Sequence, residues 1–131
     1  MTTHPPIAIT LFSFGYKYEA PRETNLLFDV RFLHNPYHVD ELRPFTGLDE
    51  RISDFVLQNK DGEACLQQLR QVITFFADEF GQKGNKELLV AVGCTGGHHR
   101  SVAVIEALAK MLMKDFQHVS HRHRDITKES H

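Results

Sequence analysis

A continuous apolar run at residues 88–92, Leu-Leu-Val-Ala-Val, leaves few folds open to this chain. Five apolar residues without a polar interruption are typical of a strand that is buried on both faces, as in a parallel sheet. A glycine-rich segment at residues 93–101 follows directly, and apolar residues at helical spacing continue from there to about Lys114. A buried strand, a glycine turn and a helix in this order are the repeating unit of α/β domains.

Other segments extend the same alternation. Residues 7–14 and 26–32 are rich in β-branched and aromatic side chains, which predicts two strands, and a short last strand is expected over residues 117–121. The apolar stripe of the longest predicted helix consists of Leu66, Leu69, Ile73, Phe76 and Phe80. The sequence therefore predicts an α/β fold, with a small, mainly parallel or mixed sheet of about four strands flanked by helices.

Length and composition limit the class of protein. The chain has 131 residues and 15.1 kDa, and we expect one domain over residues 1–131, with a core at about residues 7–124 and a flexible polar tail at residues 125–131. Fifteen Lys and Arg against seventeen Asp and Glu give a formal charge of −2, so no general basic field favours nucleic acid. Two cysteines form no disulfide framework, and no apolar run approaches the ~18 residues of a membrane span. We expect a cytoplasmic protein without a membrane partner.

The glycine-rich segment carries the clearest functional signal. Its backbone N–H groups lie where a helix begins, and such groups are unpaired and attract anions. Gly96 and Gly97 allow the backbone to approach a ligand closely, and Arg100 in the first helical turn is favourable when an anion is also present. The candidate ligand residues are Thr95, Gly96, Gly97, His98, His99, Arg100 and Ser101. Together they predict a site for a phosphate group.

An alternative chemistry involves Cys94. Cys94 and Arg100 are spaced as C-x5-R and are followed by a serine, which resembles the signature of cysteine-dependent phosphatases. Such a loop activates a thiolate for phosphoryl or sulfur transfer. Against this chemistry, Gly93 replaces the histidine that usually precedes the nucleophile, and only Asp29 and Asp40 are conceivable general acids. We therefore expect no catalytic residue, and keep an enzyme that uses Cys94 and Arg100 as the alternative.

Four motifs occur in order along the chain. They are SFGYKY at residues 13–18, FDVRFLHNP at residues 28–36, ELRPFTGLD at residues 41–49 and GCTGGHHRS at residues 93–101. With these motifs, the sequence closely resembles the C-terminal domain of the RapZ-type RNase adapter family over roughly residues 7–124. Four motifs in register are far more specific than one glycine-rich loop.

The resemblance implies a binding module. In this family the C-terminal domain is similar to a sugar-phosphate-binding subdomain of phosphofructokinase, forms homo-oligomers, binds small regulatory RNA and senses an amino-sugar phosphate, glucosamine-6-phosphate. The residues that match the family's ligand loop are Thr95, Gly96, Gly97, His99 and Arg100. The SFG(F/Y)K segment of the family falls on Lys17 and Tyr18, near the pocket and the RNA-facing surface. Arg31 and Arg43 are further candidates for contacts to the ligand or to phosphate.

Three departures limit what the resemblance implies. The family's N-terminal nucleotide-binding domain is missing and no GxxxxGK[ST] motif occurs, so we expect no ATP, GTP or other cofactor; a separate nucleotide-binding chain is a candidate partner. At Tyr37 some members carry a histidine that lines the pocket, and here His38 comes one place later, which allows a different ligand. The family's basic C-terminal tail is replaced by HRHRDITKESH at residues 121–131, which is only partly charged at neutral pH and weakens the inference of RNA binding.

Two main hypotheses follow. In the first, the protein is a sensor in which residues 95–100 bind a phosphorylated metabolite, a sugar phosphate or a nucleotide, and Arg31 or Lys17 closes over it. In the second, RNA binds to a basic surface beside Tyr18. The candidate RNA-binding residues are Lys17, Arg43, Arg122, Arg124 and Lys128.

The histidines near the C-terminus suggest a metal site by their spacing alone. His118, His121 and His123 follow the pattern H-x2-H-x-H, and imidazoles at short spacing suit zinc or nickel. No carboxylate or thiol accompanies them at a matched spacing in the sequence. We therefore expect no metal.

Overall fold

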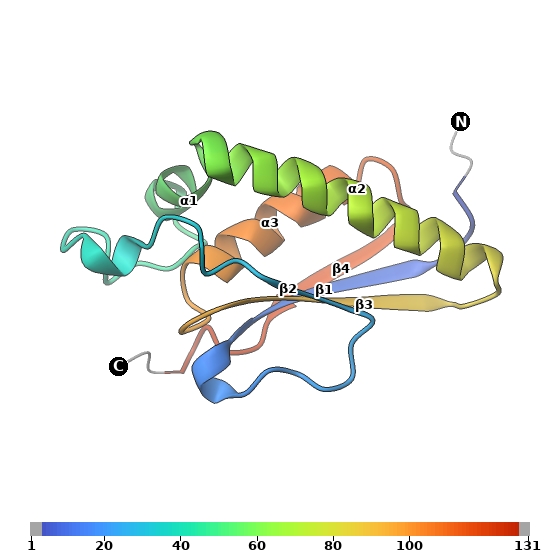
Figure 1. The fold of residues 1–131 in the computed structure, drawn as a ribbon, viewed down its shortest axis with the longest axis horizontal. Coiled ribbons are helices and arrows are strands. Elements are labelled where there is room, and N and C mark those ends of the chain that lie inside the picture. The colour runs from blue at the N-terminus through green and yellow to red at the C-terminus, as the bar shows by residue number, and fades with distance from the viewer. Residues whose placement is uncertain (1–3, 129–131) are drawn as a thin grey trace.

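The computed structural model describes residues 4–128 (Figure 1). Its strands within these residues are β1 (Ala8–Gly15), β2 (Leu26–Asp29), β3 (Glu87–Cys94) and β4 (His118–His123). Its helices there are α1 (Glu50–Leu57), α2 (Lys60–Gln82) and α3 (Arg100–Leu112), together with the short 3₁₀ helices η1 (Tyr16–Tyr18) and η2 (Pro36–His38). None of the helices in this part of the chain is long and apolar enough to cross a lipid bilayer. The chain is thus a small α/β domain, as predicted.

All four strands run parallel, in the order β2-β3-β1-β4. β3 pairs with β1 along its whole length, from Glu87 opposite Ala8 to Cys94 opposite Gly15. Because parallel strands end at the same edge, the segments that follow β1, β2 and β3 meet there. This carboxyl edge is where open parallel sheets usually bind their ligands.

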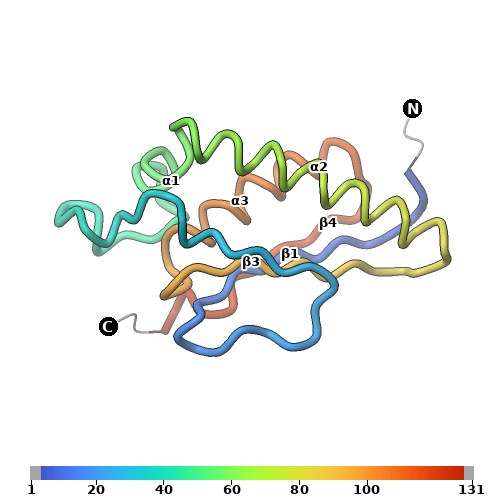
Figure 2. The backbone as a smooth tube through the Cα atoms, viewed as in Figure 1, coloured from blue at the N-terminus to red at the C-terminus, as the bar shows by residue number. Residues whose placement is uncertain are grey.

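The three helices pack on one face of the sheet (Figure 1). Ile9 and Leu11 of β1 are fully buried beneath them. On the opposite face, Phe12, Phe14 and Ala91 form a second, small cluster. The chain between β1 and β2 runs along the side of the sheet away from α2 and α3 (Figure 2). This face therefore has no α-helix over it, although all-parallel sheets are usually covered on both sides.

Comparison with the predicted strands shows one agreement and one difference. In β3, Val90, Ala91 and Val92 are fully buried, which confirms the strand predicted from its apolar run. β2 ends at Asp29, three residues earlier than predicted, because the Asp29 carboxylate accepts a hydrogen bond from the backbone N–H of Arg31 at 2.9 Å. Such a local bond offers the backbone an alternative to the ladder of the sheet.

The buried carboxylate of Asp125, which follows β4, attaches the C-terminal end of the described residues to the end of β1. The side chain of Asp125 is fully buried and accepts a hydrogen bond from the backbone N–H of Gly15 at 2.8 Å. It also forms ion pairs with Arg124 and Lys128, both at 2.8 Å. The segment predicted as a flexible tail, residues 125–131, thus begins with a buried group, and residues 129–131 lie outside the described residues.

Replacement of this carboxylate tests its role. Burial alone would raise the pKa of Asp125, but the hydrogen bonds from Arg124, Gly15 and Lys128 outweigh it and hold the pKa below its usual range. We expect Asp125→Asn to lower the free energy of unfolding at pH 7 by about 1–3 kcal/mol, because neutral hydrogen bonds replace charge-assisted ones. Urea unfolding measures the change, with the exposed Asp40→Asn as a control expected to stay within about 0.5 kcal/mol of wild type.

The pH dependence gives a second test of the same variant. A carboxyl whose pKa is lowered in the folded state stabilises the protein above its unfolded pKa of about 3.9 and loses this effect as the pH falls through the folded pKa. The difference between wild type and Asp125→Asn should therefore shrink below about pH 4. A difference that stays constant from pH 7 to pH 3 would contradict the assignment.

Candidate functional site

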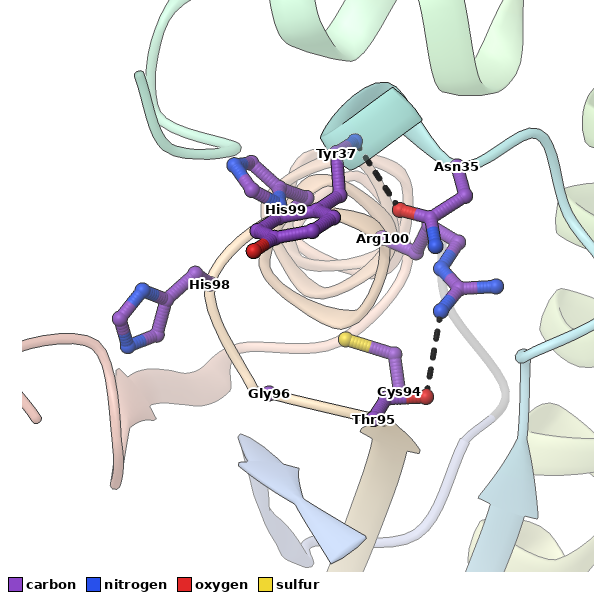
Figure 3. A pocket seen from close by; sticks show the side chains of 8 residues that line it. All are labelled: Asn35, Tyr37, Cys94, Thr95, Gly96, His98, His99 and Arg100. Atoms are coloured by element: carbon purple, nitrogen blue, oxygen red, sulfur yellow. Dashed lines mark hydrogen bonds between the residues drawn. The ribbon is translucent and has the colours of Figure 1, made fainter. Parts of the chain in front are cut away.

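A cavity of about 250 Å³ opens at the carboxyl edge of the sheet (Figure 3). The loop after β3 and the first residue of α3 form one wall, and the segment after β2 forms the other. The lining residues are Asn35, Tyr37, Cys94, Thr95, Gly96, His98, His99 and Arg100. Six of these eight belong to the glycine-rich segment, residues 93–101, and five of the six were predicted as phosphate ligands; the sixth is Cys94.

Two glycines shape the loop after β3. Gly97 has a φ of +75°, a left-handed conformation that favours glycine. A Cβ on Gly97 would lie 2.7 Å from the backbone nitrogen of Gly15, and a Cβ on Gly15 would lie 2.5 Å from the carbonyl carbon of Gly96. The backbone N–H of Lys17 also donates a hydrogen bond to the carbonyl oxygen of Thr95 in this loop, at 3.1 Å. The end of β1 therefore holds the loop in place through backbone contacts.

Arg100 brings a buried positive charge to the cavity. Its side chain is only 6% exposed, and its guanidinium donates hydrogen bonds to the carbonyl oxygens of Arg31 at 2.5 Å and Leu33 at 3.4 Å and to the Thr95 hydroxyl at 3.4 Å. Burial lowers the pKa of Arg100, but an arginine keeps its proton in a protein. Its hydrogen-bond partners are all neutral, and within residues 4–128 no carboxylate forms an ion pair with it. The carboxylate of Asp29 attracts Arg100 electrostatically but is itself paired with Arg31.

The two histidines of the loop differ in their surroundings. His99 is buried and its Nε2 lies 3.2 Å from the carbonyl oxygen of Arg43, to which it donates. Burial lowers the pKa of His99, so this ring is neutral at pH 7. The Nε2 atom of His98 is also buried, and the described residues offer it no hydrogen-bond partner. His98 therefore lines the cavity and keeps one buried polar atom without a partner among the described residues.

Cys94 lies at the base of the cavity, with its Sγ 3.2 Å from the Ser101 hydroxyl. A Cβ at residue 93 would lie 2.3 Å from the ring of Phe14, which explains why a glycine stands where phosphatases carry a histidine. Asp29 forms hydrogen bonds to Arg31, and these lower the pKa of Asp29, so this carboxylate holds no proton to donate at neutral pH. The geometry thus places a thiol at the cavity but gives Asp29 no role as a general acid.

The cavity lining does not include the other predicted ligand residues, which are Lys17, Tyr18, Arg31, Gly97 and Ser101. Ser101 contacts Cys94 from behind the loop. Arg31 lies over the ring of Tyr16 at 3.9 Å, and only its carbonyl reaches Arg100. Asn35 was missed by the sequence reasoning, although it lies within the FDVRFLHNP motif and in the long loop after residue 32, and such loops are often functional.

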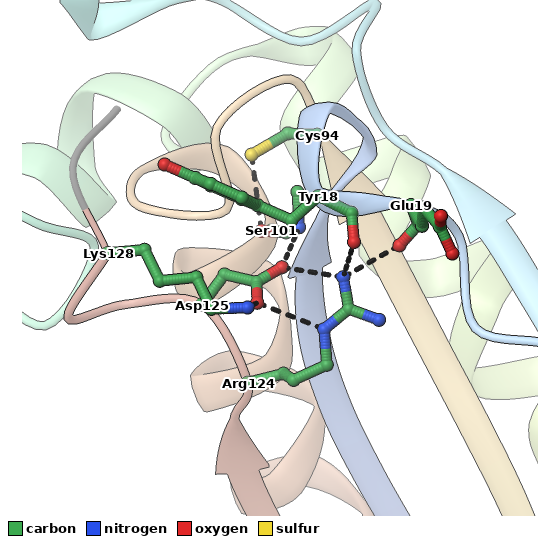
Figure 4. Close-up of polar contacts among 8 residues, drawn as sticks. Tyr18, Glu19, Cys94, Ser101, Arg124, Asp125 and Lys128 are labelled. Carbon is green, nitrogen blue, oxygen red and sulfur yellow. Dashed lines mark hydrogen bonds and ion pairs between the residues drawn. The ribbon is translucent and has the colours of Figure 1, made fainter. Parts of the chain in front are cut away.

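Residues far apart in the sequence form a second basic cluster next to η1 (Figure 4). Arg124 donates hydrogen bonds to the carbonyl oxygens of Tyr18 and Glu19 at 3.0 and 2.7 Å. The ammonium groups of Lys17 and Lys128 lie 5.5 and 4.9 Å from the centre of the Tyr18 ring. We call these residues the Tyr18 cluster: Lys17, Tyr18, Arg124 and Lys128.

The two remaining candidates for RNA binding lie elsewhere. Arg43 pairs with Asp40 and lies 4.9 Å from the ring of Tyr37, beside the cavity. Arg122 lies over the ring of Phe12 at 4.8 Å, on the face of the sheet without helices. The structure thus brings together only part of the predicted basic surface.

Comparison with known proteins identifies the family. The model of the RapZ C-terminal domain matches residues 7–127. Similar proteins include nucleotide-binding proteins of Caldanaerobacter subterraneus, Bacillus cytotoxicus and Brevibacillus brevis, which are 46%, 44% and 43% identical over 94%, 92% and 94% of this chain. The aligned part is 43%, 41% and 42% of their own lengths, so the chain spans less than half of these relatives. The matching region covers the whole sheet and the entire cavity lining, and the chain belongs to the family of RapZ C-terminal domains.

Proposed function

We propose that the cavity binds the phosphate group of a small phosphorylated metabolite and that the protein acts as a regulatory binding module. The observation that carries this proposal is the buried guanidinium of Arg100, which lies at the cavity with only neutral hydrogen-bond partners among the described residues. The Asp29 carboxylate attracts it electrostatically but forms its ion pair with Arg31. A buried charge is costly unless an opposite charge or a full set of hydrogen bonds accompanies it. A phosphate supplies both, since guanidinium groups bind phosphate through two parallel hydrogen bonds.

The start of α3 supports the same ligand. Helices α1 and α2 begin with capping side chains, Asp49 and Asn59, and each has an acidic residue in its first turn. Helix α3 has neither, because its N-cap residue His99 makes no capping bond and its first residue is Arg100. The backbone N–H groups at this end carry a partial positive charge that favours an anion.

The size of the cavity favours a compact ligand. Its volume of about 250 Å³ lies below the ~300–1,000 Å³ that is typical of pockets for drug-sized molecules, so a sugar phosphate fits better than a nucleotide. The Asn35 amide and the Tyr37 ring, opposite the phosphate loop, would contact the sugar (Figure 3). The relatives are named nucleotide-binding proteins, but the chain spans less than half of them, and their nucleotide site need not lie in the shared part.

Ligand binding is tested by thermal stability. We expect glucosamine-6-phosphate or glucose-6-phosphate to stabilise the protein by RT ln(1 + [L]/Kd), about 2.7 kcal/mol at 100 times Kd, and the unphosphorylated sugars to have no effect. Thr95→Val and Arg100→Ala, with folding checked by circular dichroism, should lose this stabilisation, whereas Arg51→Ala on α1 should keep it. A wild-type melting curve that no sugar phosphate, nucleoside monophosphate or inorganic phosphate moves would refute the proposal.

The same preparation addresses the alternative in which Cys94 is a nucleophile. If the protein is an enzyme, it should hydrolyse a generic aryl phosphate and lose this activity in Cys94→Ser. If the protein binds a sugar phosphate but hydrolyses no aryl phosphate, the result supports the binding module and excludes this enzymatic alternative.

RNA binding is the second candidate function, and the Tyr18 cluster is the observation that favours it. Lys17 and Lys128 flank the aromatic ring of Tyr18. Such an arrangement suits a nucleic acid strand, whose base can stack on the ring while its phosphates pair with the lysines. The carbonyl of Thr95 in the ligand loop is bonded to the backbone of Lys17, so a bound metabolite would influence this surface directly. The homo-oligomer and the separate nucleotide-binding chain remain predictions.

A salt titration tests the second candidate. We expect single-stranded RNA to bind with an affinity that falls steeply with salt, and each of Lys17→Ala and Lys128→Ala to reduce the slope of log K against log salt by about 0.7. Lys110→Ala, on the exposed side of α3, is the matched control and should leave the slope unchanged. Filter binding between 50 and 200 mM salt, roughly the range in which such contacts are lost, gives the measurement. No binding at the lower concentration would exclude this function.

A further inference from the structure

The lining of the cavity is one-sided in its charge. Among residues 4–128, it contains the guanidinium of Arg100 but no Asp or Glu side chain. Burial lowers the pKa of His99, so this imidazole adds no positive charge at pH 7. The wall opposite the loop after β3 consists of the Asn35 amide and the Tyr37 phenol (Figure 3). A ligand that fills the cavity therefore meets at least one cation and no carboxylate.

Two acidic residues of the neighbouring segments are already paired. The carboxylate of Asp29 accepts hydrogen bonds from the side chain of Arg31 at 2.7–3.1 Å, and Asp40 forms an ion pair with Arg43 at 2.8 Å. Asp29 also attracts Arg100 electrostatically. Neither carboxylate lines the cavity, so neither is placed to pair with a positively charged group of a ligand.

The aromatic ring of the cavity is in contact with a cation as well. The guanidinium of Arg43 lies 4.9 Å from the centre of the Tyr37 ring, and its Nε atom donates a hydrogen bond to the Tyr37 carbonyl oxygen at 2.7 Å. Aromatic rings attract cations, but this ring already has one. A second cation at Tyr37 would lie near a like charge, so the ring does not replace the missing carboxylate.

We propose that the cavity selects phosphate esters whose remaining part carries no positive charge, such as the phosphates of neutral sugars, over esters that carry an ammonium group. The inference rests on the proposed function, since it places the phosphate group at Arg100. The phosphate then compensates the guanidinium, and a hydroxyl group of the ligand can bond to the Asn35 amide, which both donates and accepts. An ammonium group would leave water without a lining carboxylate to pair with, and a charge buried in this way is costly.

Calorimetric titration at pH 7 with two matched pairs of ligands tests the proposal. Glucose-6-phosphate and glucosamine-6-phosphate differ in one hydroxyl group that an ammonium group replaces, and ethylene glycol monophosphate and phosphoethanolamine form a smaller pair of the same kind. We expect the ligand with the ammonium group to bind at least about 10-fold more weakly than its neutral counterpart, because the charged group loses its hydration and gains no partner charge.

Exchange of one amide for a carboxylate gives the variant that tests the cause. The Oδ1 atom of Asn35 accepts the backbone N–H of Tyr37 at 3.1 Å, so Asn35→Asp keeps this acceptor and adds a negative charge to the cavity lining. We expect the ratio of the two affinities in each pair to fall to about 1 or to reverse. The ratio is the informative quantity, because attraction between the new carboxylate and Arg100 would weaken both members of a pair.

Asn25→Asp is the matched control. The Oδ1 atom of Asn25 also accepts a backbone N–H, from Leu89 at 2.8 Å, so the exchange again keeps the acceptor and adds one charge. Asn25 precedes β2 and therefore lies at the amino edge of the parallel sheet, opposite the cavity. Its affinity ratio should equal that of wild type, and unchanged circular dichroism confirms that both variants fold.

Three results would overturn the proposal and leave the proposed function intact. The first is equal or tighter binding of the ligands with an ammonium group by the wild-type chain. The second is binding of inorganic phosphate without binding of any of the four esters. The third is a wild-type ratio in Asn35→Asp, which would mean that the charge of the lining does not set the preference. If neither inorganic phosphate nor any phosphate ester binds, the proposed function itself fails.

Discussion

The close approach of β1 to the glycine turn after β3 is the contact on which the rest of the site depends. Neither Gly15 nor Gly97 has space for a Cβ, because each would meet the backbone of the other segment at 2.5–2.7 Å. The backbone N–H of Gly15 is in turn bound by Asp125, which follows β4. Three strands thereby fix one loop, and a larger side chain at either glycine would push the loop away from the sheet and change the shape of the cavity.

The charge of Arg100 gives this rigid loop its chemistry. The guanidinium is removed from water by carbonyl groups of the segment after β2, and these groups orient it without neutralising it. The Asp29 carboxylate attracts this charge but is paired with Arg31, so under the proposed function an anion in the cavity supplies the direct partner. His99, which is neutral and bound to the carbonyl of Arg43, adds no second positive charge at pH 7. Under the proposed function, selectivity for the remainder of the ligand therefore falls to the opposite wall of the cavity, at Asn35 and Tyr37.

Local patterns in the sequence were sufficient for the strand, turn and helix around residues 88–112, because apolar spacing and glycines act over a few residues. They could not show that Asn35 lies across the cavity from the loop after β3 or that Glu106 faces His121 and His123, since those contacts depend on how distant segments pack together. The early end of β2 was missed for a different reason. The Asp29 side chain competes with the neighbouring strand for the backbone N–H of Arg31. The apolar residues around it still give the sequence the pattern of a strand, so this local hydrogen bond could not be predicted.

The order of the strands has a consequence for the behaviour of the protein at high concentration. β2 and β4 lie at the two margins of the sheet, where unpaired backbone groups can recruit a strand from another molecule and start aggregation. β2 is only four residues long, which offers little template for such growth. β4 is longer, but it carries imidazoles and the guanidinium of Arg122 on both of its faces. An apolar strand of another molecule would have to lie against these polar groups. The composition of β4 therefore disfavours the addition of further strands at this edge of the sheet.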